Sequence, residues 1–131
     1  METNKTPQFA CPNASNDLFT LKTGTKGNKA LTNPIGLITA DEVAYAGGVN
    51  STTNSTYYLY TGSDYWIISP QLFQNLAYEY TVSSNGNLFG SSLNNRDFGV
   101  RPVINLKSTV EIEEGGIGTA SNPYVIKYNM G

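Results

Sequence analysis

The side chains that could carry out chemistry in this sequence are few, and the commonest catalytic ones are missing. Among 131 residues there is no histidine, and the single cysteine is Cys11. A serine or cysteine nucleophile therefore has no histidine base to activate it. Zinc would find neither histidine ligands nor a second cysteine. Glycine motifs that bind phosphates or dinucleotides are also absent. We predict that the chain is not an enzyme and that it holds no cofactor and no metal ion.

Carboxylates are the remaining groups through which catalysis or metal binding could work. The pair at 41–42 is best explained as a helix start, and the run at 111–114 as a solvated strand edge. Residues 94–97 (NNRD) offer oxygen ligands for calcium but lack the spacing of a calcium-binding loop. An enzyme is a minor alternative, which would need a deep cleft where carboxylates with raised pKa values converge. Its candidate residues are Asp64, Glu79 and Asp97.

Tyrosine is the most abundant aromatic residue, and six of the nine tyrosines lie between residues 57 and 80. Successive side chains of a strand face opposite ways, so not all six can be buried. Tyrosine beside asparagine and serine is typical of adaptable recognition surfaces. The alternative is that these tyrosines only cover a sheet. Trp66, by contrast, is predicted to pack in the core.

Charge limits the classes of partner. Charged residues make up 14% of the chain, the net charge is −2, and no stretch gathers lysine and arginine. Nucleic-acid binding and a polybasic membrane patch are therefore not expected. Met1 is followed by polar residues, and no export signal or membrane span is visible. The abundance of Asn, Ser, Thr, Gly and Tyr favours a domain excised from an exported protein over a cytosolic protein.

The pattern of the chain predicts an α+β fold in a single domain over residues 1–131, with residues 1–16 as a flexible or edge segment. A short helix is expected over 38–48, where Thr39 and Glu42 have capping-box spacing and Gly47-Gly48 supplies the stop. Strands are expected over 77–82 and 87–93, joined by a two-residue turn at Asn85-Gly86.

Other elements are expected on either side of this hairpin. Residues 17–22 are predicted to form a short strand, and the segments 57–60 and 65–70 are β-like. Residues 99–106 are predicted to form a buried strand, with Pro102 at an edge or bulge. A last hairpin is expected to pair 109–112 with 124–128.

Three segments carry a resemblance to a known family: residues 34–48 (PIGLITADEVAYAGG), residues 57–70 (YYLYTGSDYWIISP), and residues 99–106 (GVRPVINL) with 122–126 (NPYVI). Their order resembles C-terminal domains of surface and pilin-like proteins from Gram-positive bacteria and their phages. Those domains are similar to the formylglycine-generating-enzyme branch of the C-type lectin fold, which includes the variable proteins of diversity-generating retroelements. The resemblance covers roughly residues 11–126.

This resemblance implies a C-type lectin-like fold, with one or two short helices, antiparallel twisted sheets and long loops. It also implies a place on the cell surface, in the extracellular space or on a phage particle. The active-site cysteines, the iron-binding histidines and the calcium motifs of related proteins are absent. Gly99 is then expected to make a close backbone contact, and Arg101 to hold a buried or stacked guanidinium.

The resemblance also implies a ligand-binding surface between residues 67 and 96, where retroelement proteins carry diversified residues. The candidate ligand-binding residues are Ile67, Ile68, Gln71, Phe73, Asn75, Tyr78, Tyr80, Ser83, Asn87, Ser91, Asn94 and Asn95. Asparagine, tyrosine and serine are what adenine-directed mutagenesis tends to produce, although they are also common on exposed loops.

The expected function is that of a non-catalytic extracellular recognition domain for adhesion or phage receptor binding. Its partner would be an extracellular protein or a glycan. A structural domain of a pilus or tail fibre that associates with copies of itself is the alternative, so a homo-oligomer is possible. Direct insertion into a membrane is not expected.

Overall fold

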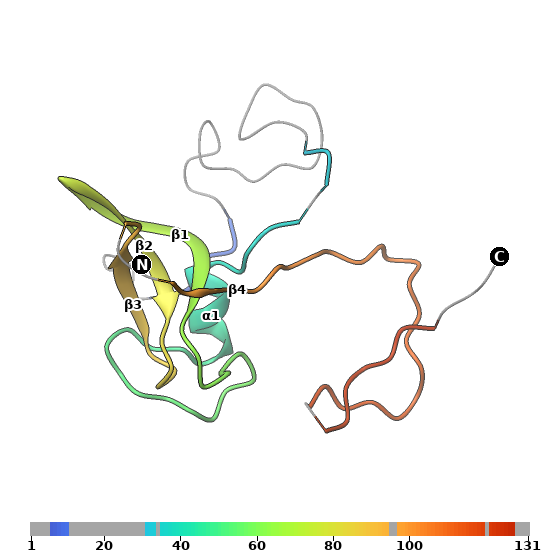
Figure 1. The fold of residues 1–131 in the computed structure, drawn as a ribbon. Helices are drawn as coiled ribbons and strands as arrows, with labels where there is room; N and C mark the ends of the chain where they lie inside the picture. The colour runs from blue at the N-terminus through green and yellow to red at the C-terminus, as the bar shows by residue number, and fades with distance from the viewer. Residues whose placement is uncertain (1–5, 11–30, 34, 95–96, 120, 128–131) are drawn as a thin grey trace.

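One short helix and a four-stranded mixed sheet make this an α+β fold (Figure 1). The computed structural model describes residues 6–10, 31–33, 35–94, 97–119 and 121–127. The elements are α1 (Ala40–Ala46), β1 (Tyr65–Gln74), β2 (Leu76–Val82), β3 (Leu88–Ser92) and β4 (Gly99–Val100). The strand order is β3-β2-β1-β4, and β4 runs parallel to β1. The predicted antiparallel sheet is therefore wrong at this one edge. The predicted strand at 17–22 lies outside the described residues.

Helix α1 lies within the predicted range 38–48 and is two residues shorter at each end, and its predicted caps are present. The Thr39 hydroxyl accepts a hydrogen bond from the Glu42 backbone N–H at 3.1 Å, and the Glu42 carboxylate accepts one from the Thr39 N–H at 2.8 Å. This reciprocal capping box satisfies two backbone donors that the helix itself cannot. Gly47 ends the helix with a φ of 118°, which a residue with a side chain rarely adopts. The predicted range 38–48 thus includes the caps.

The predicted pairing of β2 with β3 is confirmed, but the predicted two-residue turn is wrong. Val82 pairs with Leu88, and the Ser83 N–H donates to the Asn87 carbonyl at 3.0 Å, which leaves three residues in the loop. A two-residue type I′ turn needs positive φ at both central residues. Here Gly86 has a φ of 80°, whereas Asn85 is not among the residues with positive φ.

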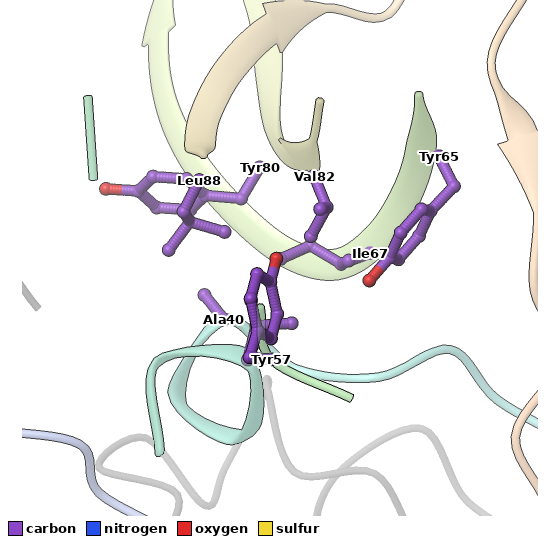
Figure 2. Close-up of a cluster of buried hydrophobic side chains, with 8 residues drawn as sticks. Ala40, Tyr57, Tyr65, Ile67, Tyr80, Val82 and Leu88 are labelled. Carbon is purple, nitrogen blue, oxygen red and sulfur yellow. The ribbon is translucent and has the colours of Figure 1, made fainter. Parts of the chain in front are cut away.

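The side chains on one face of the sheet form the core, and we call this the closed face. Tyr65, Val82 and Leu88 lie side by side on three paired strands, and all three are buried. Helix α1 covers them with Ala40 and Val43. Figure 2 shows Tyr57 between this helix and the strands. The remaining buried core residues are Ile67 and Tyr80.

Tyr57 enters the core from a turn, so the β-like prediction for residues 57–60 is wrong. The Tyr60 N–H donates to the Tyr57 carbonyl at 3.0 Å, which closes the turn. The Tyr57 hydroxyl donates to the Gly86 carbonyl at 3.0 Å and thereby ties the turn to the β2–β3 loop. The pKa of Tyr57 is raised to about 12, mainly by burial and to a lesser extent by the nearby Tyr65, while Arg101 opposes both.

Residues 101–119 and 121–127 form what we call the C-terminal arm, which runs away from the sheet in Figure 1. The predicted buried strand at 99–106 is wrong, because β4 is two residues long and Ile104 and Leu106 are exposed. Pro102 has no N–H with which to extend the ladder. Beyond it, Val103 exchanges two backbone hydrogen bonds with Gly36, at 2.7 and 3.0 Å.

The last predicted hairpin is present as a short pairing within the arm. Ile112 forms an antiparallel bridge with Ile126. The Glu113 N–H donates to the Val125 carbonyl, and the Lys127 N–H donates to the Glu111 carbonyl. Tyr128, at the end of the predicted range, lies outside the described residues.

Candidate functional site

The face of the sheet opposite the core carries an aromatic cluster, and we call it the open face. Trp66, Thr81 and Phe89 are paired across β1, β2 and β3, one residue out of step with the core residues, so their side chains point the other way. Trp66 is half-buried on this face, so its predicted place in the core is wrong. The Phe98 ring lies edge-on to Trp66, with centroids 4.8 Å apart, and 6.3 Å from Phe89.

A carboxylate lies next to this cluster on the same face. Glu79 is two residues from Thr81 on β2 and pairs with Ser91 on β3. Partial burial raises the pKa of Glu79. Among the described residues, Glu79 has neither an ion pair nor a side-chain hydrogen bond. The open face thus presents an acceptor for a donor or cation beside aromatic rings, a combination that suits cation–π and charge-assisted contacts.

The open face continues to the distal ends of β1 and β2, which project beyond the helix in Figure 1. Phe73 pairs with Ala77, two residues beyond Glu79, and its side chain is 76% exposed. Asn75, with a φ of 60°, forms the tip between the strands. A large exposed aromatic side chain on a projecting hairpin is the kind of group that anchors protein interfaces.

Irregular pairing in β1 sets the direction of this projection. The register between β1 and β2 shifts between Trp66 and Pro70 and again between Pro70 and Leu72. Proline cannot donate to the ladder, and such bulges bend the strand that carries them. Two hydrogen bonds attach this bulged segment to the helix start, from the Ala40 N–H to the Ser69 hydroxyl at 2.8 Å and from the Ile68 N–H to the Ile38 carbonyl at 2.9 Å.

The structure separates the predicted ligand-binding residues into distinct places. Ile67 and Tyr80 are buried on the closed face, so they are unavailable to a ligand, and we remove them from the candidate surface. Ser83 and Asn87 lie in the β2–β3 loop, where their side chains bond to each other at 2.9 Å. That loop is at the end of β2 opposite the projecting tip.

The other predicted residues lie nearer the projecting tip. Phe73 and Ser91 lie on the open face, although Ser91 is buried there beside Glu79. Ile68 lies beside the segment that leads into the helix, and Asn75 lies at the projecting tip. Of the rest, Gln71 and Tyr78 are half-buried and Asn94 is exposed, while Asn95 lies outside the described residues.

Sequence reasoning did not place the aromatic and acidic residues that define this face: Trp66, Glu79, Phe89 and Phe98. The signal that could have found them is the two-residue period of the strands. Once Val82 and Leu88 are assigned to the core, Thr81, Glu79 and Phe89 must face the other way.

The expectations for Gly99 and Arg101 are confirmed. The Arg101 guanidinium stacks over the Tyr65 ring, 4.9 Å from its centroid, and donates to the Leu59 carbonyl at 3.1 Å. The Gly99 N–H donates to the Asp64 carbonyl at 3.0 Å, and a Cβ on residue 99 would lie 3.3 Å from that oxygen. Gly99 thus holds β4 to the residue before β1, and Arg101 holds the start of the C-terminal arm to Tyr65 of β1.

A hollow of about 160 Å³ lies between the start of α1, β1 and the base of the C-terminal arm. It contains none of the three carboxylates of the enzyme alternative, and its own Glu42 is occupied by the capping box.

Within the described part of the chain, no three histidine, cysteine or acidic side chains come together to hold a metal ion. The calcium candidate at 94–97 includes two residues outside it. Among the described residues, no helix has the length and apolar character needed to cross a membrane.

No protein-family model, no curated protein and no solved structure matches the chain. The function must therefore be argued from the open face.

Proposed function

We propose that this chain is a non-catalytic recognition domain that binds an extracellular protein or a glycan on the open face of its sheet. The observation that carries the proposal is the cluster of Trp66, Phe89 and Phe98 beside the Glu79 carboxylate, which no described residue pairs with. Aromatic rings supply contact area at a low cost in side-chain entropy, and the carboxylate supplies direction. The sheet and its capped helix form a rigid support, which lowers the entropy cost of binding.

The finer parts of this proposal come from the sequence motifs. We propose a C-type lectin-like scaffold, a location at the cell surface or on a phage particle, and diversification of the ligand-binding surface by a retroelement. After removal of the two core residues, diversification would act on the ten remaining candidates, which include Phe73, Asn75, Tyr78 and Asn94. A near-copy of the coding segment for residues 67–106, differing mainly at adenines and beside a reverse transcriptase gene, would support it.

A binding experiment with matched variants tests the proposal. The full chain, Phe73→Ser and Tyr58→Ser would each be immobilised and exposed to a glycan array and to a surface-protein extract. Phe73 and Tyr58 are both 76% exposed, but Phe73 lies on the open face and Tyr58 in the turn that enters the core. We expect Phe73→Ser to lose the bound ligand and Tyr58→Ser to keep it. Equal binding by all three proteins would contradict the proposal.

Self-association is the second candidate function, and the C-terminal arm favours it. Nine large apolar side chains of the arm are exposed: Val103, Ile104, Leu106, Val110, Ile112, Ile117, Tyr124, Val125 and Ile126. Large exposed apolar side chains gathered in one segment are typical of contact sites.

A further inference from the structure

The first half of the C-terminal arm, residues 101–110, has the chemistry of a ligand. It carries Arg101 and Lys107, and it contains no carboxylate. Its large apolar side chains, Val103, Ile104, Leu106 and Val110, are all exposed. Arg101 is engaged by Tyr65, whereas Lys107 has no ion pair or side-chain hydrogen bond among the described residues.

The body of the domain has the opposite charge. Residues 35–100 carry five carboxylates, those of Asp41, Glu42, Asp64, Glu79 and Asp97, against one basic side chain, that of Arg96. Glu79 is the one that lies on the open face beside aromatic rings. Each copy of the chain therefore carries an apolar segment with one free lysine, Lys107, and an aromatic surface with one carboxylate, Glu79. Opposite charges on two surfaces favour their association and fix the register in which they meet.

The arm leaves its own sheet in a fixed direction. Two backbone hydrogen bonds hold Val103 to Gly36, which precedes the helix that covers the closed face. The following residues run away from the sheet in Figure 1. This geometry presents residues 104–110 to a neighbour and turns them away from the sheet of their own chain.

We propose that a ligand of the open face is residues 104–110 of a second copy of this chain, packed over the aromatic cluster with Lys107 paired to Glu79. The inference rests on the proposed recognition role of that face. The contact is head-to-tail: the arm of one copy meets the sheet of the next. Such heterologous contacts close into rings or continue as filaments, which is the assembly expected of a fibre or stalk.

A charge-reversal experiment tests the contact. Light scattering after gel filtration would follow the full chain, Glu79→Lys, Lys107→Glu and the double variant from about 1 μM to about 1 mM. We expect the unaltered chain to associate as its concentration rises. Each single reversal should weaken association at least about tenfold, because it places like charges together. The double variant should recover most of it. Ile104→Ser should also weaken association, with Tyr58→Ser as the unchanged control.

Three results would overturn the inference. The unaltered chain could remain a monomer throughout, the single reversals could leave association unchanged, or the arm could be protected from hydrogen exchange in a concentration-independent monomer. The third would mean that the arm docks on its own body. None of these results touches the recognition role itself, which fails only if Phe73→Ser binds ligand as well as Tyr58→Ser does.

Discussion

The two faces of the sheet are built from alternate residues of the same strands, yet they have different compositions. The closed face pairs Tyr65, Val82 and Leu88, all buried under the helix. The open face pairs Trp66, Thr81 and Phe89 one position along, beside the Glu79 carboxylate, which has no partner in the described part of the chain. Apolar packing explains the first set completely. The second set includes a partly buried charge that costs stability, which suggests that it is kept for binding.

The largest difference in stability should appear between substitutions of a buried leucine of the closed face and of an exposed leucine outside the core. Leu88 is 0% exposed on the closed face, whereas Leu93 is 53% exposed just beyond β3. Leu88→Ala should lower the free energy of unfolding by about 2–5 kcal/mol, because it leaves a cavity. Leu93→Ala should lower it by less than about 1 kcal/mol. Urea denaturation of both variants measures the difference, and equal losses would show that the closed face is not the core.

A smaller effect is expected from removal of one buried hydroxyl. Tyr57→Phe deletes the donor to the Gly86 carbonyl and should lower the free energy of unfolding by about 1–2 kcal/mol. The control is Tyr58→Phe, which alters an exposed side chain and should have no measurable effect. Thermal unfolding of the two variants would settle the comparison. No loss in Tyr57→Phe would mean that water replaces this bond.

Alkaline pH should weaken the closed face through the same tyrosine. Burial raises the pKa of Tyr57 to about 12 from its ordinary value of 10. The folded protein therefore holds its proton more tightly, so the stability it contributes is complete below pH 10 and declines as the pH rises towards 12. Burial raises the pKa of Tyr65 in the same direction. Denaturation between these pH values should show a steeper loss for the unaltered chain than for Tyr57→Phe.

The smallest effect on stability is expected on the open face, where a substitution should raise the free energy of unfolding instead of lowering it. Burial raises the pKa of Glu79, so the folded state disfavours the charged form, and stability should fall as the pH rises through the ordinary value of 4.5. Glu79→Gln should remove this dependence and make the protein slightly more stable at pH 7, while ligand binding weakens. If Glu79→Gln lost stability and still bound its ligand, Glu79 would have a structural role and would lie outside the binding site.

The sequence was sufficient for features that depend on local signals. The capping box of Thr39 with Glu42, the stop at Gly47 and the β2–β3 pairing all follow from spacing within a few residues. The stacking of Arg101 was expected from the family resemblance and is present. These features define the helix and two of the four strands.

Features that depend on long-range packing could not be predicted in the same way. The bulges around Pro70 change which residues of β1 face the core, so Trp66 could not be assigned from its type alone. The apolar residues of 99–106 predicted burial, but Pro102 interrupts the pairing and the arm leaves the sheet. The surroundings of Glu79 depend on the pairing of β2 with both β1 and β3, and no pattern within a few residues of the sequence predicts that pairing.

Trp66 is the only tryptophan in the chain and lies on the open face, so its fluorescence tests the central claim most directly. Acrylamide quenching of Trp66 would be measured for the free domain and for the domain saturated with a captured ligand or associated with its own copies. If the open face is the binding surface, the bound ligand or the second copy should shield Trp66 and reduce the rate at which acrylamide quenches its fluorescence. Unchanged quenching in a demonstrably bound complex would contradict the claim and place the interface elsewhere.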